Sequence, residues 1–286
     1  MKPVNKEVVL DISDLLPNGE GLAEINARRV QVRNALPGEV VSARILKKKK
    51  GIKYADAIEV VRSSQDRTDI ACKSYPRCGG CSMLHMLPSK EVELKSKKLN
   101  MDLTSRGIVF EETLDPVVNN FLHYRRKARL GVKCLGDTVL VGFRESFSSR
   151  VARIDACKIL TYELSNLIPI LKETISQCSI KQFIPQIEVA EGDLGRAIIV
   201  RHLRSFTELD LTIWRRFSEK HRVTVYFQPG GYDSLVPLTT GMSECVLNYS
   251  LQEQGISIWF QPEPVSYTHL RAHETSLHLV CRLLLE

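Results

Sequence analysis

Short runs in which apolar and polar residues alternate dominate the first sixty positions of the chain. Two such runs lie at residues 29–33 and 39–45, and runs rich in β-formers lie at residues 7–11 and 55–61. Turn-forming residues separate them, most clearly at 17–21, which reads PNGEG. Strands about ten residues apart with turns between them predict a small β-barrel of the OB-like kind.

The apolar spacing becomes helical further along the chain. It predicts helices over residues 88–106, 162–177 and 207–221. Thr207, with Asp210 three positions later, marks the start of the last of these, because such a pair can cap a helix N-terminus.

Further β-rich runs alternate with these helices. They predict strands at residues 139–144, 151–154, 186–190, 196–202, 223–228, 245–251 and 255–260. The sequence therefore indicates a multi-domain protein, with a barrel over residues 1–62 and an α+β domain with an antiparallel sheet over residues 63–263.

Composition limits the class of protein. The chain has 286 residues, of which 43% are hydrophobic, enough for one large or two modest domains. It has no run of eighteen apolar residues and no apolar stretch near the N-terminus, so we expect no membrane span and no signal peptide. We expect a cytoplasmic monomer. The net charge of +7 fits a polyanionic partner.

Four cysteines form the most specific pattern. Cys72, Cys78 and Cys81 lie within ten residues, in a loop that also holds one proline and two glycines, and Cys157 follows the strand predicted at 151–154. Zinc favours two short C-x2–4-C pairs, whereas iron–sulfur clusters take four thiolates that need not be adjacent. The C-x5-C-x2-C spacing suits a [4Fe–4S] cluster better than zinc. Disulfides are disfavoured without a secretory signal.

Other cysteines and one histidine have simpler interpretations. Cys134, Cys178 and Cys245 lie in apolar or strand context and are expected to be buried thiols. His85 is close to the loop, but with four cysteines available we expect it to support the loop and not to bind metal. The alternative for the loop itself is three unrelated buried thiols.

Two basic segments are candidates for RNA contact. The first is at the tip of the last barrel hairpin, and the second combines cations with an aromatic residue before a strand. Their candidate residues are Lys47, Lys48, Lys49, Lys50, Lys53, Tyr124, Arg125, Arg126, Lys127 and Arg129. The alternatives are a solvated loop for the first and a charge-guarded edge strand for the second.

These features together resemble bacterial 23S rRNA (uracil-5-)-methyltransferases of the RumA/RlmD type. The similarity runs over residues 7–263 and rests on the leading barrel of TRAM type, the cysteine loop with remote Cys157, the YRRKAR segment from Tyr124, VGFRE from Val141 and WFQP from Trp259. It implies a [4Fe–4S] cluster on Cys72, Cys78, Cys81 and Cys157, 23S rRNA as partner and S-adenosylmethionine as methyl donor.

The chain departs from that family pattern after residue 263. The family continues into a Rossmann-like methyltransferase domain that supplies the nucleophilic cysteine, the base and the cofactor site. Residues 264–286 instead resemble translated adapter sequence, and we expect a foreign tail in which Cys281 has no role. We therefore expect this chain to be catalytically inactive alone, and the helix at 88–106 to pack on the missing domain through Leu94, Leu99 and Leu103.

Three other functions stay open at this stage. A redox or radical enzyme is one, although radical enzymes use C-x3-C-x2-C and leave one iron open. A zinc- or cluster-stabilised RNA-binding module without activity is the second. The third is a soluble α+β scaffold whose thiols are unconnected.

Overall fold

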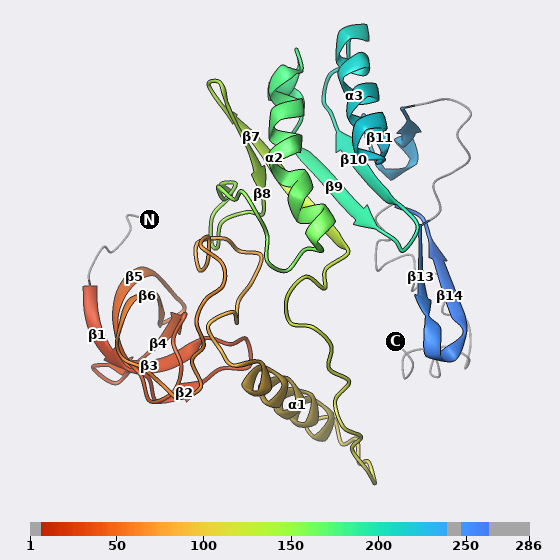
Figure 1. Cartoon of the computed structure of the whole chain (residues 1–286). Helices are drawn as coiled ribbons and strands as arrows, with labels where there is room; N and C mark the ends of the chain where they lie inside the picture. Colours follow the sequence, from red (N-terminus) through yellow and green to blue (C-terminus); the bar gives the residue numbers. More distant parts are fainter. Residues whose placement is uncertain (1–6, 239–246, 263–286) are drawn as a thin grey trace. The chain divides into compact units, whose positions relative to one another are not determined.

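The computed structural model describes residues 7–238 and 247–262 and divides into two compact units (Figure 1). The first unit comprises residues 1–125 and 138–172, and the second comprises residues 126–137 and 173–286. Cys245, Cys281 and the tail at 264–286 lie outside the described residues.

A six-stranded sheet begins the first unit. Its strands, in the order β1-β5-β6-β4-β3-β2, are β1 (Glu7–Asp11), β2 (Asp14–Leu15), β3 (Gly21–Ile25), β4 (Arg28–Arg33), β5 (Val40–Lys49) and β6 (Ile52–Arg62). Only β4 and β6 pair in parallel. Strand β1 also contacts β3, so the sheet curls back on itself around a core that includes Val30, Val32 and Val41 (Figure 1). The β-rich character predicted for these residues is confirmed.

The long hairpin of this sheet is made by β5 and β6. Its tip is the turn at Lys50 and Gly51, whose φ angles of 49° and 83° lie in the left-handed region. Alternate residues of β5, from Val41 to Ile45, are buried because successive side chains of a strand point to opposite faces. The Lys residues that follow lie beyond this core, where the hairpin extends into solvent.

The rest of the first unit contains helix α1 (Pro88–Thr104), strand β8 (Thr138–Gly142) and the start of helix α2 (Tyr162–Gln177), which ends in the second unit. Helix α1 has Pro88 at its first position, where a missing N–H costs nothing. It has no buried residue, and Leu99 is 58% exposed. Charged side chains on its surface form ion pairs within the helix, such as that between Lys95 and Glu91.

The second unit has a sheet in which the strands run in the order β12-β11-β10-β9-β7. These are β7 (Lys127–Leu135), β9 (Gln186–Glu191), β10 (Arg196–Arg201), β11 (Thr224–Gln228) and β12 (Val236–Pro237). Strands β10 and β11 pair in parallel, so the expectation of a purely antiparallel sheet is wrong. Helix α3 (Glu208–His221) links these two strands, and a connection of that length permits parallel pairing.

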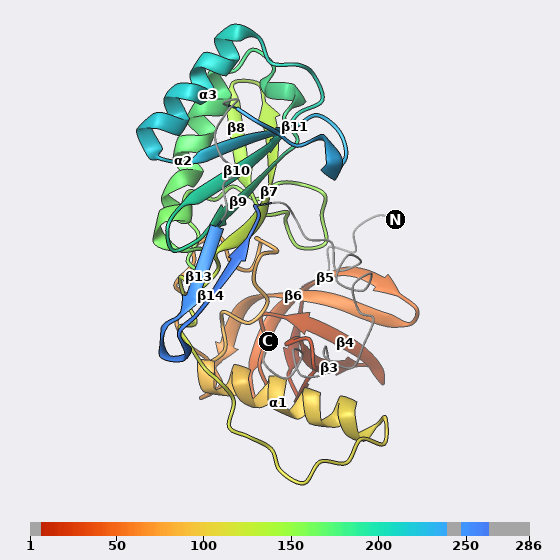
Figure 2. The ribbon, with the colours of Figure 1, turned by 90° about the vertical axis from the view of Figure 1, so that its right-hand side faces the viewer.

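A separate ribbon of β13 (Leu247–Leu251) and β14 (Ile256–Phe260) completes the second unit (Figure 2). Three short 3-10 turns, Lys181–Phe183, Tyr232–Ser234 and Gln252–Gln254, lie between its elements. Gly192 allows the ribbon to approach closely, since a Cβ there would lie 2.7 Å from the backbone of Asn248.

Helix α3 (Glu208–His221) is capped as the sequence predicts. The Thr207 hydroxyl accepts from the N–H of Asp210, and the Asp210 carboxylate accepts from the N–H of Thr207, which is a capping box. The helix packs on the sheet through buried Trp214, whose ring lies 6.3 Å from that of Phe227 on β11.

No helix in the described part of the chain combines the length and the apolar character that a membrane crossing requires.

Candidate metal centre and nucleic-acid interface

All four predicted cysteine ligands line one cavity in the first unit. Cys72, Cys78, Cys81 and Cys157 share it with apolar side chains that include Phe143, Leu84, Ile154 and Ile159. Cys78 and Cys157 are buried, and Cys72 and Cys81 are half-buried. All six cysteines of the described residues are free thiols, so no disulfide competes for these sulfurs there.

Backbone contacts shape the cysteine loop. The N–H of Cys78 donates to Ser74 O at 2.8 Å, and the N–H of Gly79 donates to Arg144 O at 2.9 Å. A Cβ on Gly79 would lie only 2.8 Å from that same carbonyl oxygen. At Gly80 a Cβ would lie 3.0 Å from the Phe143 ring. The two glycines therefore let the loop lie against the segment that follows β8.

Cys157 reaches the loop from a different local structure than expected. Residues 151–154 do not form a strand, because Val151 makes only an isolated bridge to Arg144. The prediction that Cys157 follows a strand is wrong. Its position is fixed instead by helix α2, since the N–H of Cys157 donates to Ser165 Oγ at 2.9 Å.

The four thiols influence one another electrostatically. Burial, together with smaller contributions from the neighbouring sulfurs of Cys157, Cys78 and Cys72, raises the pKa of Cys81 to about 12. Burial likewise raises the pKa of Cys78, with contributions from Cys157 and Cys72. A cationic group between the sulfurs would oppose this repulsion and favour the thiolates, which is the form that binds metal.

The four thiols are donors of the type that an iron–sulfur cluster takes. Within residues 7–238 and 247–262, no three His, Cys, Asp or Glu side chains converge on a point that could hold a single metal ion. A [4Fe–4S] cluster is held by four thiolates on separate irons and needs no such convergence. Four thiols line one largely apolar cavity, and thiolates in such surroundings are the usual ligands of this group.

His85 lies behind the loop and is not among the residues that line the cysteine cavity. It is fully buried, and its Nδ1 lies 2.6 Å from the Tyr75 hydroxyl, which also donates to Ser82 O at 2.9 Å. Burial lowers the pKa of His85 to about 4, so the ring is neutral at pH 7. The expectation that His85 supports the loop stays a prediction.

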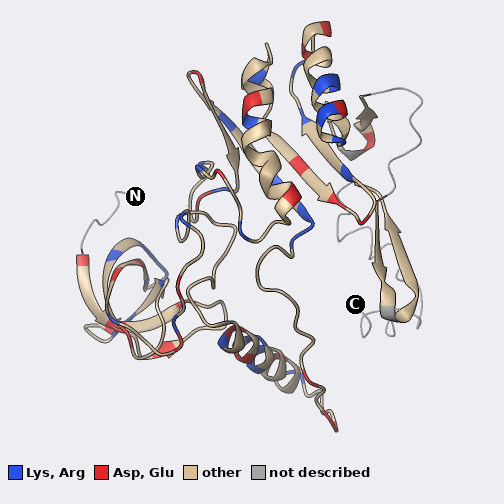
Figure 3. Cartoon of the chain, viewed as in Figure 1, with Lys and Arg blue, Asp and Glu red and all other residues tan. Residues whose placement is uncertain are grey.

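The lysines of the barrel hairpin are arranged as predicted, at the end of β5 and the start of β6 (Figure 3). Lys48, Lys49 and Lys50 are exposed, while Lys47 and Lys53 are half-buried. Lys48 faces Lys53 across the hairpin, so like charges are adjacent. Like charges placed opposite each other in a sheet repel and are unfavourable. An anionic partner such as a phosphate would reduce that repulsion.

The second basic segment is divided between the two units. Tyr124 and Arg125 belong to the first unit, and Arg126, Lys127 and Arg129 belong to the second. Arg126 pairs with Asp193 at 2.5 Å, and Arg129 pairs with Glu188 at 2.9 Å, both within the second unit. These two cations therefore have carboxylate partners and are weaker candidates for phosphate contact. Strand β7 pairs with β9 along this segment.

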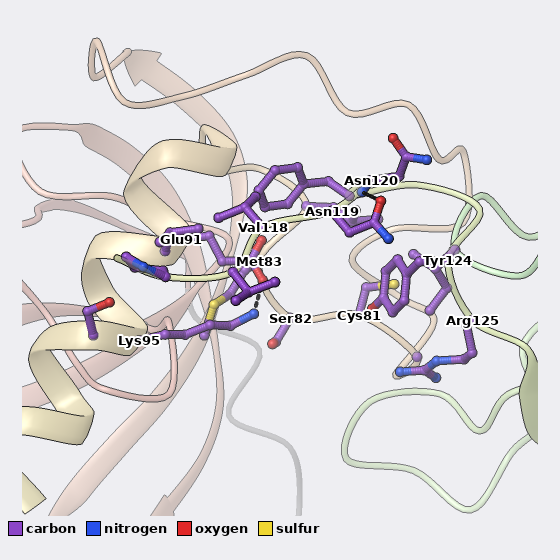
Figure 4. Close-up of a pocket in the computed structure, with 18 residues that line it drawn as sticks. Cys81, Ser82, Met83, Glu91, Lys95, Val118, Asn119, Asn120, Tyr124 and Arg125 are labelled. Carbon is purple, nitrogen blue, oxygen red and sulfur yellow. Dashed lines mark hydrogen bonds and ion pairs between the residues drawn. The ribbon is translucent and has the colours of Figure 1, made fainter. Parts of the chain in front are cut away.

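Tyr124 and Arg125 line a second, larger pocket beside the cysteine loop (Figure 4). Its volume is about 490 Å³, and its walls come from α1, the cysteine loop and the segment before Tyr124. Tyr124 is 51% exposed. Its backbone is held by the neighbours, since the N–H of His123 donates to Lys158 O at 2.8 Å and that of Arg125 donates to Ile159 O at 2.7 Å.

Two residues near the lysine hairpin were not predicted from sequence. Arg33 and Phe147 lie together with Lys47 and Tyr54, although they are far apart in the chain. Phe147 belongs to a polar turn in the sequence and Arg33 to an alternating strand. Only the unusual presence of an aromatic residue within that polar turn offers a sequence signal.

Comparison with known proteins places these features in a family. No model of a known protein family matches the chain. A 23S rRNA (uracil(1939)-C(5))-methyltransferase RlmD from Hahella chejuensis is 33% identical over 297 residues, which cover 97% of this chain and 67% of the relative. The chain belongs to the RlmD-type 23S rRNA uracil-C5 methyltransferase family. The family resemblance expected from the sequence is confirmed.

Other family members match at similar identity. RlmD from Acinetobacter baumannii strain AYE is 31% identical over 99% of this chain, and RlmD from Legionella pneumophila strain Lens is 35% identical over 88% of it. The chain spans 64% of the Acinetobacter protein and 57% of the Legionella protein. The Acinetobacter match extends into residues 264–286, so it gives no support to a foreign origin of that segment, which stays a prediction.

A solved structure shares the family fold. The Pyrococcus abyssi tRNA (uracil-54, C5)-methyltransferase, in complex with S-adenosyl-L-homocysteine, superposes with a TM-score of 0.61 at 18% sequence identity. The match covers 89% of this chain and 59% of that chain. The mixed α/β architecture with several sheets is therefore that of an RNA uracil-C5 methyltransferase fold.

Proposed function

We propose that this chain supplies the RNA-recognition and [4Fe–4S]-bearing part of an enzyme that methylates uracil C5 in 23S rRNA. The observation that carries the proposal is the meeting of Cys72, Cys78, Cys81 and Cys157 around one cavity in a member of the RlmD-type family. S-adenosylmethionine is the proposed methyl donor. The S-adenosyl-L-homocysteine in the Pyrococcus structure is what that donor becomes after transfer.

The four cysteines are the proposed ligands of the cluster, which would link the loop to Cys157 when bound. Their backbone contacts, which involve the segment after β8 and helix α2, explain how ligands distant in sequence reach one cavity. The proposed RNA contacts are the hairpin lysines together with Tyr124 and Arg125, which lie in the same unit as the cysteines.

Methyl transfer requires groups beyond these. Uracil C5 is a weak nucleophile, so the reaction needs a thiolate that adds to C6 and a base that removes the C5 proton. Within residues 7–238 and 247–262 there is no glycine-rich turn between a strand and a helix of the kind that holds a nucleotide cofactor. We therefore propose that these 286 residues bind RNA but do not transfer methyl groups by themselves.

Metal analysis tests the cofactor. Anaerobically purified protein should contain about four irons and four acid-labile sulfides per chain, with a broad visible charge-transfer band. Zinc without sulfide would instead support the alternative, a zinc-stabilised RNA-binding module.

RNA binding and methyl transfer test the rest of the proposal. A 23S rRNA stem-loop should bind in a salt-dependent manner, because lysine–phosphate contacts release counterions. Labelled S-adenosylmethionine should yield no methylated RNA with this chain, whereas a complete RlmD enzyme in the same assay should yield it. Transfer by this chain would contradict the proposed division of roles.

A further inference from the structure

Phe147 occupies an unusual position in the first unit. It lies in the turn that follows β8, between Ser146 and Ser148, and its φ angle is +54°. This left-handed conformation is uncommon for residues other than glycine, asparagine and aspartate, and it is a genuine outlier for a bulky side chain. The ring is 54% exposed, so burial does not explain the choice of phenylalanine.

Three barrel side chains surround this ring. The Lys47 ammonium lies 3.9 Å and the Arg33 guanidinium 4.6 Å from its centroid, both within cation–π range. The Tyr54 ring meets it edge to face, with centroids 6.3 Å apart and planes at 65°. The turn thus presents an exposed aromatic ring to the basic hairpin of β5 and β6.

The two cations have different partners. Arg33 is held by both oxygens of Asp56, with its Nε and Nη2 each 2.5 Å from an oxygen, so its charge is largely balanced. Lys47 pairs with no carboxylate in the described residues; it contacts only the rings of Tyr54 and Phe147. Its charge, together with exposed Lys48 and its neighbours, is available for an anion.

We propose that Phe147 is a stacking platform for one base of single-stranded RNA, with Lys47 and the hairpin lysines contacting the phosphates beside that base. An exposed ring next to uncompensated cations is the combination that single-strand RNA sites use. Residues other than glycine that are held in the left-handed region cluster at active sites, ligand clamps and switch regions. This inference rests on the proposed function, because it assumes that the chain binds RNA.

A structural role for Phe147 would be to attach the turn to the barrel. The two roles predict opposite effects of Phe147→Asn, because asparagine tolerates a left-handed backbone and removes the ring. If the ring serves RNA, the variant should keep or raise the melting temperature while its RNA affinity falls roughly 5- to 150-fold. If the ring serves packing alone, the melting temperature should fall while affinity is kept.

The experiment uses the full chain with its cofactor retained and a short fluorescein-labelled single-stranded RNA. Fluorescence anisotropy gives the affinity, and thermal unfolding gives the melting temperature. Phe110→Asn is the matched control, because Phe110 is also an exposed phenylalanine, at 41%, but has no ring or cation partner among the described residues. It should leave the affinity unchanged.

Phe147→Trp provides a second readout. It should retain binding, and its tryptophan emission should be quenched by RNA more strongly than that of the parent chain, because a stacked base quenches an indole. Wild-type affinity in Phe147→Asn, or no added quenching in Phe147→Trp, would overturn the platform alone. A parent chain that binds no RNA would overturn both the platform and the proposed function.

Discussion

Glu39 and Arg67 form a bidentate ion pair in the first unit. Arg67 Nε lies 2.6 Å from one carboxylate oxygen of Glu39, and its Nη2 lies 2.8 Å from the other. The Glu39 side chain is fully buried, and the backbone N–H groups of Leu36 and Ser64 also donate to it. The pair therefore ties the barrel to the segment that leads into the cysteine loop.

Glu39→Gln should lower the free energy of unfolding by about 3 kcal/mol at pH 7, because it leaves a largely buried arginine without its charged partner. Burial alone would raise the pKa of Glu39, but the hydrogen bonds from Arg67, Leu36 and Ser64 outweigh it and hold the pKa below its usual value. A carboxylate whose pKa is lower in the folded state than in the unfolded state stabilises the folded state at pH values above the unfolded pKa, here about 4.3. That stabilisation is lost as the pH falls through the folded-state pKa.

Urea unfolding between about pH 7 and pH 3 checks this expectation. The difference between the parent chain and Glu39→Gln should be constant at neutral pH and shrink below about pH 4. Arg62→Gln is the control, since Arg62 meets Asp11 at 3.4 Å with side chains 65% and 82% exposed. Its effect should stay within about 0.5 kcal/mol. A pH-independent difference for Glu39→Gln would show that the charge is not responsible.

Removal of one proposed ligand should remove the cluster. Cys157→Ala should abolish the visible charge-transfer band, because only three of the four proposed thiolate ligands remain. The melting temperature of the first unit should also fall, because the cavity then lacks the cluster that links its walls. Cys134→Ala is the matched control: its Sγ is half-buried, 3.2 Å from Lys181 O, in the second unit. It should keep the band. A full iron content in Cys157→Ala would remove Cys157 from the ligand set.

The capping box of helix α3 should contribute measurably to stability. Thr207→Ala removes the hydroxyl that accepts from the N–H of Asp210, and should cost about 1 kcal/mol. Thr207→Ser keeps the acceptor and should cost a few tenths at most. Chemical denaturation followed by tryptophan fluorescence suits this test, because Trp214 lies on the same helix and is buried. Equal losses in both variants would point to the Thr207 methyl group.

The exposed leucine of helix α1 should be replaceable without loss of stability. Leu99 is 58% exposed, so Leu99→Lys should change the free energy of unfolding by no more than about 0.5 kcal/mol. It should also reduce aggregation, measured by light scattering, because it interrupts exposed apolar surface. The opposite case is Leu164→Lys, which places a charge at a fully buried site and should prevent folding. A large loss of stability in Leu99→Lys would mean that the helix packs on another surface.

Local sequence signals predicted the elements that depend on neighbouring residues. Helix α3 was expected from residue 207 onward because Thr207 and Asp210 form a cap between residues three apart. The hairpin lysines were placed correctly because the turn at Lys50 and Gly51 depends on local conformation. The cavity lined by the four cysteines was predicted from the C-x5-C-x2-C spacing of Cys72, Cys78 and Cys81, together with the distant Cys157.

Features that depend on distant residues were not predicted. The alternation at residues 151–154 resembles a strand, but that segment meets only Arg144 in an isolated bridge. Arg126 and Arg129 each pair with a carboxylate more than fifty residues away in the chain, and no local sequence signal indicates those partners. Phe147 lies in a turn and contacts Arg33 on β4 and Lys47 on β5. No local sequence pattern indicates contacts between residues so far apart in the chain.

The alternation of the chain between its two units constrains how the protein is made. The boundaries fall after Arg125, Asp137 and Lys172, so neither unit is a single continuous segment. Strand β7 leaves the ribosome well before β9, the strand with which it pairs. The first unit likewise needs residues up to 172 before it is complete. During synthesis, the edge of β7 that pairs with β9 must therefore stay unpaired until residues 186–191 have been made, and an expression boundary placed between the two units would always divide one of them.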